Sequence, residues 1–148
     1  SAPYEGINEL LSALKQRNMI TAVASSTPWP LVHKILKDFS FTSYFDVIVG
    51  SNPSDEMKNK ADFDQKTRII KKTFIKLKEI GMTPALDEKF LSSTIMIGDK
   101  NYDIFGAKAN KITSAGAAWG YGSLDELADA GADFIFKKPH DLQDFQLT

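Results

Sequence analysis

The stretch TIMIGDKNYDIFGAKAN, residues 94–110, places two aspartates four positions apart at the point where a strand gives way to a helix. Its first residues, 94–97, are a short apolar run typical of a buried strand, and a helix is predicted over 101–109. Carboxylates this close repel each other, and Lys100 is their one obvious local partner. Asp99 and Asp103 therefore indicate either a solvent-exposed loop with no binding role or a site that binds a positively charged ligand.

Helices and strands alternate on both sides of this stretch. An irregular segment is expected at 82–93, and a last helical turn is expected after the final strand. Thr27 and Asp62 are the predicted N-caps of two helices. Helices are predicted at 5–17, 28–39, 62–81, 101–109 and 123–131, and strands at 19–24, 46–50, 94–97, 112–118 and 133–136. This alternation predicts an α/β fold of three layers, a Rossmann-like parallel sheet with helices on both faces. We see no linker and no second domain.

Composition narrows the classes of function. The chain has 148 residues, 43% hydrophobic and 25% charged, with a formal net charge of −1, so no bulk field favours nucleic acid or an anionic membrane. The lysines of 66–78 alternate with apolar residues and are expected on the solvated back of an amphipathic helix. There is no cysteine, no apolar run as long as a membrane span and no signal-peptide pattern, which fits a cytoplasmic protein.

Polar residues follow the strands at one edge of the predicted sheet, which is where open α/β sheets bind ligands. Ser25 and Ser26 follow the first strand, Lys58 and Lys60 the second, and Asp99 and Asp103 the third. Each has an ordinary interpretation when taken alone: a turn serine, a surface lysine, an acid near a helix start. Their joint order at one edge indicates a site.

Other candidates have weaker patterns. His33 and His140 lack a partner at metal-ligand spacing, and both are interpreted as surface or packing residues. Trp119 and Tyr121, after the fourth strand, are expected to pack a loop.

The segments VASSTP, NKADF and MIGDKNYDIFGAKANKI resemble the second, third and fourth motifs of the haloacid dehalogenase superfamily of phosphohydrolases. The branch of phosphoglycolate phosphatase-like enzymes and β-phosphoglucomutase is most similar, and the resemblance covers nearly the whole chain. It implies that Asp99 is a Mg²⁺ ligand and that Asp103 holds the metal's water shell or its neighbours. It implies that Ser25, with Ser26 beside it, binds the phosphoryl oxygens, and that Lys60, preferred over Lys58, neutralises the phosphate and the nucleophile.

A cation also resolves the repulsion between the two acids. Mg²⁺ binds through one or two carboxylates together with phosphate and water, and phosphoryl transfer needs charge stabilisation and alignment above all.

One departure from the family pattern is large. The first motif, an Asp-x-Asp that carries the nucleophile at the end of a strand, has no counterpart here. Asp46, the acid nearest an early strand, precedes its strand and so faces the other edge. In the family the missing strand lies between those that end at Ser25 and Asp99. Residues 1–148 are therefore expected to be the C-terminal portion of a haloacid dehalogenase-like core domain, without cap and first motif.

These inferences predict a Mg²⁺-dependent phosphatase of small phosphorylated metabolites, with the isolated chain inactive or barely active. The expected partner is its own N-terminal segment or a swapped dimer partner, with no nucleic acid and no membrane. A non-catalytic binding or scaffold module of the same fold is the alternative. A phospho-accepting receiver domain fits less well because the chain opens on a helix, and no G-x-G-x-x-G supports dinucleotide binding. The substrate is not readable, since the cap selects it.

Overall fold

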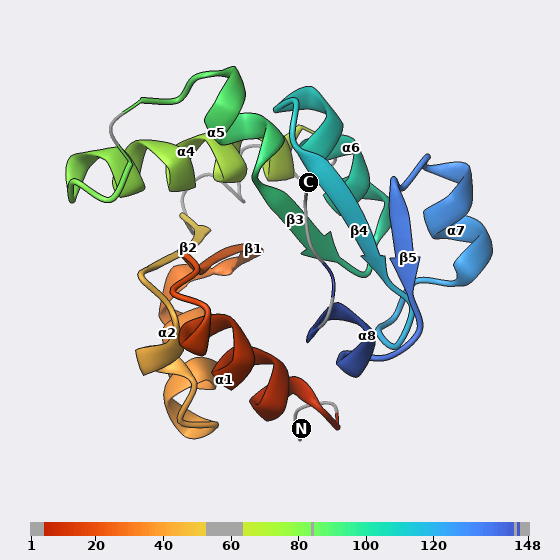
Figure 1. Cartoon of the computed structure of the whole chain (residues 1–148), viewed down its shortest axis with the longest axis horizontal. Coiled ribbons are helices and arrows are strands. Elements are labelled where there is room, and N and C mark those ends of the chain that lie inside the picture. The colour runs from red at the N-terminus through yellow and green to blue at the C-terminus, as the bar shows by residue number, and fades with distance from the viewer. Residues whose placement is uncertain (1–4, 53–63, 84, 144, 146–148) are drawn as a thin grey trace.

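The computed structural model describes residues 5–52, 64–83, 85–143 and 145, and its α/β architecture with parallel strands confirms the predicted fold class. The helices and strands follow in the order α1 Ile7–Gln16, β1 Ala22–Pro28, α2 Trp29–Asp38, η1 Thr42–Tyr44 (a 3₁₀ turn), β2 Val47–Ser51, α4 Gln65–Glu79, α5 Glu88–Ser92, β3 Ile95–Gly98, α6 Asn101–Ala109, β4 Thr113–Ala117, α7 Leu124–Asp129, β5 Phe134–Phe136 and α8 His140–Gln143 (Figure 1).

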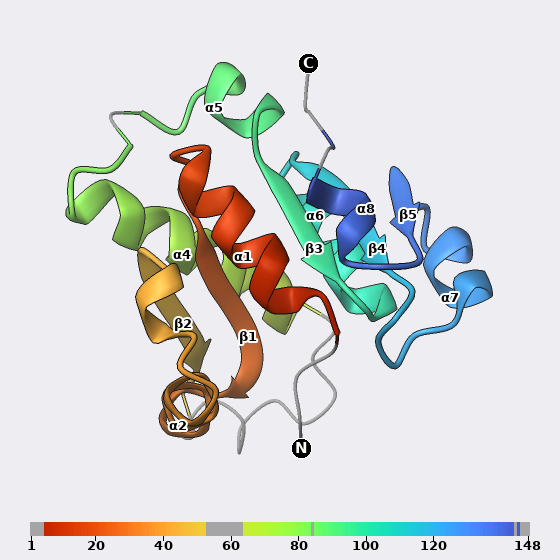
Figure 2. The same cartoon turned by 60° about the horizontal axis from the view of Figure 1, so that its bottom comes forward.

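The strands form two separate parallel sheets. β1 pairs with β2, and β3, β4 and β5 pair in that order. In the described part of the chain β1 pairs only with β2 and β3 only with β4, so each keeps one edge without a strand neighbour. Both strands run in the same direction (Figure 2). The open edges agree with the sequence analysis, which placed a missing strand between these two.

Local signals account for most element boundaries. The Ser123 hydroxyl accepts a hydrogen bond from the Glu126 N–H at 3.0 Å and starts α7, as its capping pattern predicts. Gly81 has φ +78°, and this left-handed conformation, which glycine adopts without strain, follows the end of α4. Helix α6 spans the residues predicted for it.

Two stretches of the chain differ from the local prediction. The first strand runs on through Pro28, which makes Pro28 rather than Thr27 the N-cap of α2. Segment 82–93, expected to be irregular, contains α5, which begins where the Asp87 carboxylate accepts from the Phe90 N–H at 2.9 Å. A helix of one turn carries too little periodicity to be recognised in sequence. The predicted cap Asp62 lies outside the described residues.

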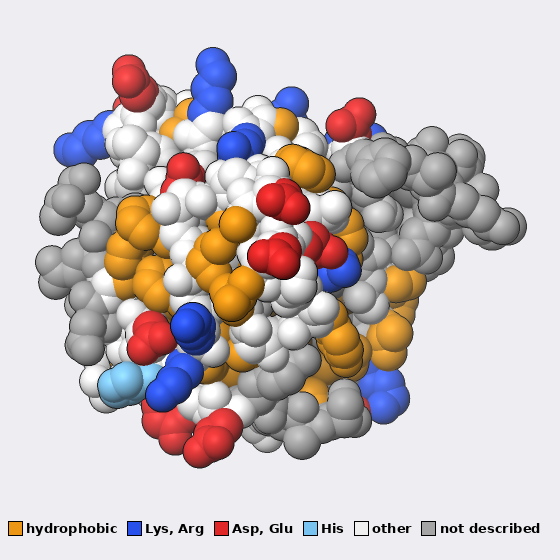
Figure 3. Space-filling view, turned by 90° about the vertical axis from the view of Figure 1, so that its right-hand side faces the viewer, with side chains coloured by type: hydrophobic (Ala, Val, Ile, Leu, Met, Phe, Trp, Pro, Cys, Tyr) orange, Lys and Arg blue, Asp and Glu red, His pale blue; other side chains and the backbone are white. Residues whose placement is uncertain are grey.

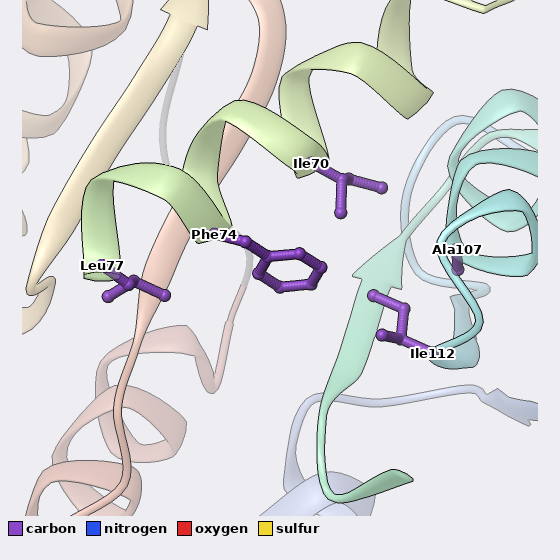
Figure 4. Close-up of a cluster of buried hydrophobic side chains, with 5 residues drawn as sticks. All are labelled: Ile70, Phe74, Leu77, Ala107 and Ile112. Carbon is purple, nitrogen blue, oxygen red and sulfur yellow. The ribbon is translucent and has the colours of Figure 1, made fainter. Parts of the chain in front are cut away.

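Helix α4 packs across the boundary between the two sheets. It contacts β1 and β2 on one side and α6 on the other, and α4 and α6 lie behind the strands while α1 and α8 lie in front (Figure 2). Figure 4 shows Ile70 and Phe74 of α4 pointing toward Ala107 of α6 and toward Ile112, with Leu77 farther along α4. The buried cluster consists of Ile70, Phe74, Leu77, Ala107 and Ile112. This cluster joins the halves on the α4 face.

The surface carries no dominant charge on the face that Figure 3 shows, where acidic, basic and hydrophobic side chains are mixed. None of the described helices has both the length and the apolar composition that crossing a bilayer requires.

Replacing Phe74 with alanine tests the cluster that α4 contributes. Phe74 is 8% exposed and stacks edge-on against Phe90, with ring centroids 5.5 Å apart. Because a cavity borders its ring, we expect Phe74→Ala to lower the free energy of unfolding by about 3 kcal/mol, the lower end of such truncations. Urea denaturation followed by circular dichroism measures this. Ile75→Ala, at a neighbouring side chain that is 52% exposed, should change it by no more than about 0.5 kcal/mol; equal losses would contradict this packing.

Candidate active site

Lys66 lies at the centre of the candidate site. It stands in the first turn of α4, is 7% exposed, and its Nζ donates to the Ala24 carbonyl oxygen of β1 at 2.9 Å. The same Nζ lies 3.0 Å from Asp103 Oδ1 of α6 and 5.8 Å from the Tyr102 ring centroid. A buried ammonium group requires such partners. Lys66 therefore brings together the two sheets at their carboxyl ends.

Asp103 is the more buried of the two acids, at 4% exposed. Its Oδ2 accepts from the Lys100 N–H at 3.1 Å, which satisfies a free donor at the start of α6. Its Oδ1 forms the ion pair with Lys66 but has no partner in hydrogen-bond geometry. A side chain on Gly98 would overlap the Asp103 carboxylate, so glycine before Asp99 makes room for it. Asp103 Oδ1 is thus buried, with the Lys66 ammonium as its charged partner.

Asp99 is held by the loop after β4. Its Oδ2 accepts from the Tyr121 N–H at 3.0 Å, and a Cβ on Gly120 or Gly122 would overlap Asp99. The neighbouring Lys100 pairs with Glu126 Oε1 at 3.2 Å, and Glu126 Oε2 accepts from the Asn101 N–H at 3.0 Å. These contacts fix the direction of the Asp99 carboxylate and leave its second oxygen for another partner.

Ser25 and Ser26 lie half-buried at the end of the regular part of β1. The pairing with β2 is regular up to Ala24 and irregular between Ala24 and Pro28. Ser25 Oγ accepts from the Thr27 N–H at 3.1 Å, which leaves the hydroxyl proton available as a donor. Because the Ala24 carbonyl binds Lys66, the backbone beside Ser25 is linked through this lysine to Asp103. No hydrogen bond joins Ser25 to Asp99 within the described residues.

The predicted Lys60, and its alternative Lys58, lie outside the described residues. The lysine found at the site is Lys66, which the sequence analysis had assigned to a solvated helix face; for this residue that prediction was wrong. Lys71, Lys72, Lys76 and Lys78 of the same helix are exposed, as expected. The available signal was periodicity, since Lys66 precedes the buried Ile70 by one helical turn and so lies on the same face.

The pKa of Tyr102 depends on its burial and on the charged groups near it. Its pKa is raised above the ordinary value of 10.0, chiefly by burial and then by Asp103 and Asp99, against a smaller opposing effect of Lys100. At this ring the negative charge of Asp103 and Asp99 outweighs the opposing charge of Lys100.

The structure also places the other residues that the sequence singled out: Asp46, the two histidines, Trp119 and Tyr121. Asp46 accepts from the Thr21 N–H at 2.8 Å, at the amino end of β1, as its position predicted. His33 and His140 are exposed, and His33 lies edge-on to Trp29 with ring centroids 6.0 Å apart. Trp119 is half-buried, but Tyr121, expected to pack a loop, is 84% exposed and contributes its backbone N–H instead.

The described residues contain no group of three or more His, Cys, Asp and Glu side chains able to hold a metal ion. Asp99 and Asp103 offer two carboxylates, one with a buried oxygen free of hydrogen bonds. This donor set fits Mg²⁺, which uses one or two protein carboxylates and takes its other ligands from phosphate and water.

Comparison with known proteins identifies the family. Residues 1–117 match the family model described as haloacid dehalogenase-like hydrolase. The chain is 32% identical over 126 residues to a 5'-nucleotidase of Pseudomonas aeruginosa, covering 84% of this chain and 49% of that protein. It is 31% identical over 140 residues to a phosphoglycolate phosphatase of Aquifex aeolicus, covering 95% and 57%.

The fold is shared with solved structures of the same group. The crystal structure of a predicted phosphatase from Clostridium acetobutylicum superposes with a TM-score of 0.75 at 34% identity, covering 95% of this chain and 57% of that one. The chain thus spans about half the length of the curated relatives that it matches.

A double-mutant cycle tests the buried ion pair. Lys66→Met leaves a buried carboxylate unpaired, and we expect it to cost about 3–5 kcal/mol of unfolding free energy, as should Asp103→Asn by the converse argument. The double variant should lose less than the two together, with an interaction energy of about 1–3 kcal/mol in urea denaturation.

The exposed pair Lys34–Asp38 on α2, with Nζ and Oδ2 2.9 Å apart, is the matched control. The cycle Lys34→Met with Asp38→Asn should give an interaction energy of about 0.3–0.5 kcal/mol. Equal coupling in the two cycles would show that burial adds nothing to the Lys66–Asp103 pair.

Proposed function

The chain belongs to the haloacid dehalogenase-like hydrolase family, and we propose that it forms the phosphate- and metal-binding part of a Mg²⁺-dependent phosphatase that hydrolyses phosphate monoesters. The observation that carries the proposal is the convergence of Lys66, Asp103 and the backbone beside Ser25 at one edge of the sheets. A 5'-nucleotidase and a phosphoglycolate phosphatase among the relatives agree with phosphate monoesters as the substrate class.

Each group has a task that its surroundings support. Asp99 and Asp103 would hold Mg²⁺, which when bound neutralises charge on the phosphoryl oxygens. The Ser25 hydroxyl, with its proton free, donates to a phosphoryl oxygen, and Ser26 stands beside it as a second donor. Lys66 supplies a fixed positive charge that costs no reorganisation during the reaction because the Ala24 carbonyl and Asp103 already hold it in place. Lys60 remains the prediction from the motif.

We infer that the nucleophile comes from outside the described residues, because the family's first motif has no counterpart in the sequence. Hydrolysis of a phosphate monoester through a carboxylate nucleophile requires an acid placed against the phosphorus, opposite the leaving oxygen. In this chain Asp99 is held by the loop after β4 and Asp103 by Lys66 and Lys100, so neither is free to attack. The isolated chain is therefore expected to be catalytically incomplete.

Expression of the longer reading frame tests the activity. We expect it to hydrolyse p-nitrophenyl phosphate with Mg²⁺ and to lose this activity in EDTA, while residues 1–148 alone show little or none. Asp99→Asn should lower kcat/KM of the longer protein by at least about 100-fold, and Asp129→Asn, an exposed carboxylate on α7, should leave it unchanged.

The alternatives give other results. Absence of turnover in the longer protein, with weak Mg²⁺ binding retained, would favour the non-catalytic binding module. Turnover by residues 1–148 alone that Asp99→Asn abolishes would contradict catalytic incompleteness.

A second comparison separates the two lysines. In the longer protein, Lys66→Met should lower kcat/KM by at least about 100-fold if Lys66 is the cation at the phosphate, and Lys60→Met should then have a small effect. Circular dichroism and urea denaturation of each variant distinguish loss of activity from loss of fold. The reverse order, with Lys66→Met folded and active, would return the assignment to Lys60.

A further inference from the structure

The charge of Lys100 competes with any cation that binds at Asp99 and Asp103. Lys100 lies between the two acids in the sequence and immediately before α6. A lysine carries its charge at the end of a flexible four-carbon stem, so this ammonium group can reach carboxylates close to it in the chain. Bound to one of them, it would cancel the negative charge that attracts Mg²⁺. The direction of the Lys100 side chain therefore decides whether the acids are open to a cation.

In the structure Lys100 pairs with Glu126 of α7 rather than with either acid. Lys100 Nζ lies 3.2 Å from Glu126 Oε1, and the two side chains are 34% and 28% exposed. Within the part of the chain that the structure describes, Lys100 forms no ion pair with Asp99 or Asp103. The lysine nearest to the two acids in sequence is thus paired with an acid 26 residues away.

The Glu126 carboxylate is held by a second contact that does not involve the Lys100 side chain. Its Oε2 accepts from the Asn101 N–H at 3.0 Å, one of the free donors at the start of α6. A Cβ on Gly122 would lie 3.1 Å from Glu126 Oε2 and would overlap the Asp99 carbonyl oxygen, so the loop before α7 packs closely on both residues. Glu126 therefore offers Lys100 a carboxylate whose position is set by backbone contacts.

Without this partner, the acid most open to Lys100 is Asp99. Asp103 is 4% exposed and already pairs with Lys66. Asp99 is half-buried, and one of its oxygens accepts from the Tyr121 N–H while the other has no hydrogen bond among the described residues. An ammonium group at this second oxygen would occupy the place of a cation and neutralise the charge that attracts it.

We propose that Glu126 is a positioning residue of the metal site: it binds the Lys100 ammonium group and so keeps Asp99 open to Mg²⁺. The inference rests on the proposed function, because it concerns the same metal site. It assigns a role to a residue of α7, outside the three segments that resemble the family motifs.

A titration of the nitrogen-15-labelled 148-residue chain with MgCl₂, followed by the amide NMR signals of 99–103, measures this role. Glu126→Gln keeps an oxygen for the Asn101 N–H but loses the charge that holds Lys100. We expect this variant to bind Mg²⁺ at least about fivefold more weakly than the unmodified chain. The control Asp125→Asn, at a neighbouring exposed acid of α7, removes the same charge without freeing Lys100 and should leave the affinity unchanged.

Removing Lys100 as well separates this role from a purely structural one. In the double variant Glu126→Gln with Lys100→Met, no ammonium group competes for Asp99, so the Mg²⁺ affinity should return to that of the unmodified chain. A loss caused by damage to the loop would remain, because Lys100→Met restores no contact of Glu126. Lys100→Met alone should bind Mg²⁺ at least as tightly as the unmodified chain.

A crystal structure of Glu126→Gln tests the pairing without any metal. We expect Lys100 Nζ within about 4 Å of the Asp99 carboxylate. Lys100 directed into solvent, an unchanged Mg²⁺ affinity of Glu126→Gln, or a double variant as weak as Glu126→Gln would each overturn the proposal and leave the metal site standing. Absence of any Mg²⁺-dependent shift in the unmodified chain would overturn the proposed metal site itself, and this inference with it.

Discussion

The ammonium group of Lys66 is the interaction on which the arrangement of this molecule depends. It binds the last regular carbonyl of β1 and the carboxylate of Asp103 in α6, the helix that follows β3 and packs on β3 and β4. One partner thus lies in the two-stranded sheet and the other on a helix that packs on the three-stranded sheet, so the lysine links the two halves of the molecule at the carboxyl ends of the strands. The apolar cluster between α4 and α6 also joins the two halves of the molecule, farther from the carboxyl ends of the strands.

The same lysine connects architecture with the proposed chemistry. A phosphate site needs fixed positive charge, and a lysine is fixed only when its surroundings bind it in one place. Burial beside Asp103 provides this, because Asp103 Oδ1 and the Ala24 carbonyl both bind the ammonium group. Asp99 is oriented by different means, the Tyr121 N–H and the close approach of two glycines, so the two acids depend on separate parts of the fold.

The edges of β1 and β3 that face each other have no strand neighbour within the described residues, and they mark the boundary between the two sheets. Cavities lined by apolar residues of β1 and β3 border these edges on both faces of the sheets. Helix α4 contacts β1 and β2 on one side and α6 on the other, and so holds the two halves together across this boundary.

The sequence by itself determined the order of helices and strands, the parallel sheet, and the two acids after the third strand, because these follow from local periodicity, caps and glycines. It placed α6 at its observed bounds, since the apolar strand and the glycine-aspartate step define the start of that helix. It could not find α5, whose single turn rests on one side-chain cap, nor extend β1 past the serines, where irregular pairing follows tertiary contacts. Only the tertiary structure decided which lysine reaches the site. Periodicity puts Lys66 on the apolar face of α4, one turn before Ile70, but the carbonyl and the carboxylate that bind it are brought there by packing from distant parts of the chain.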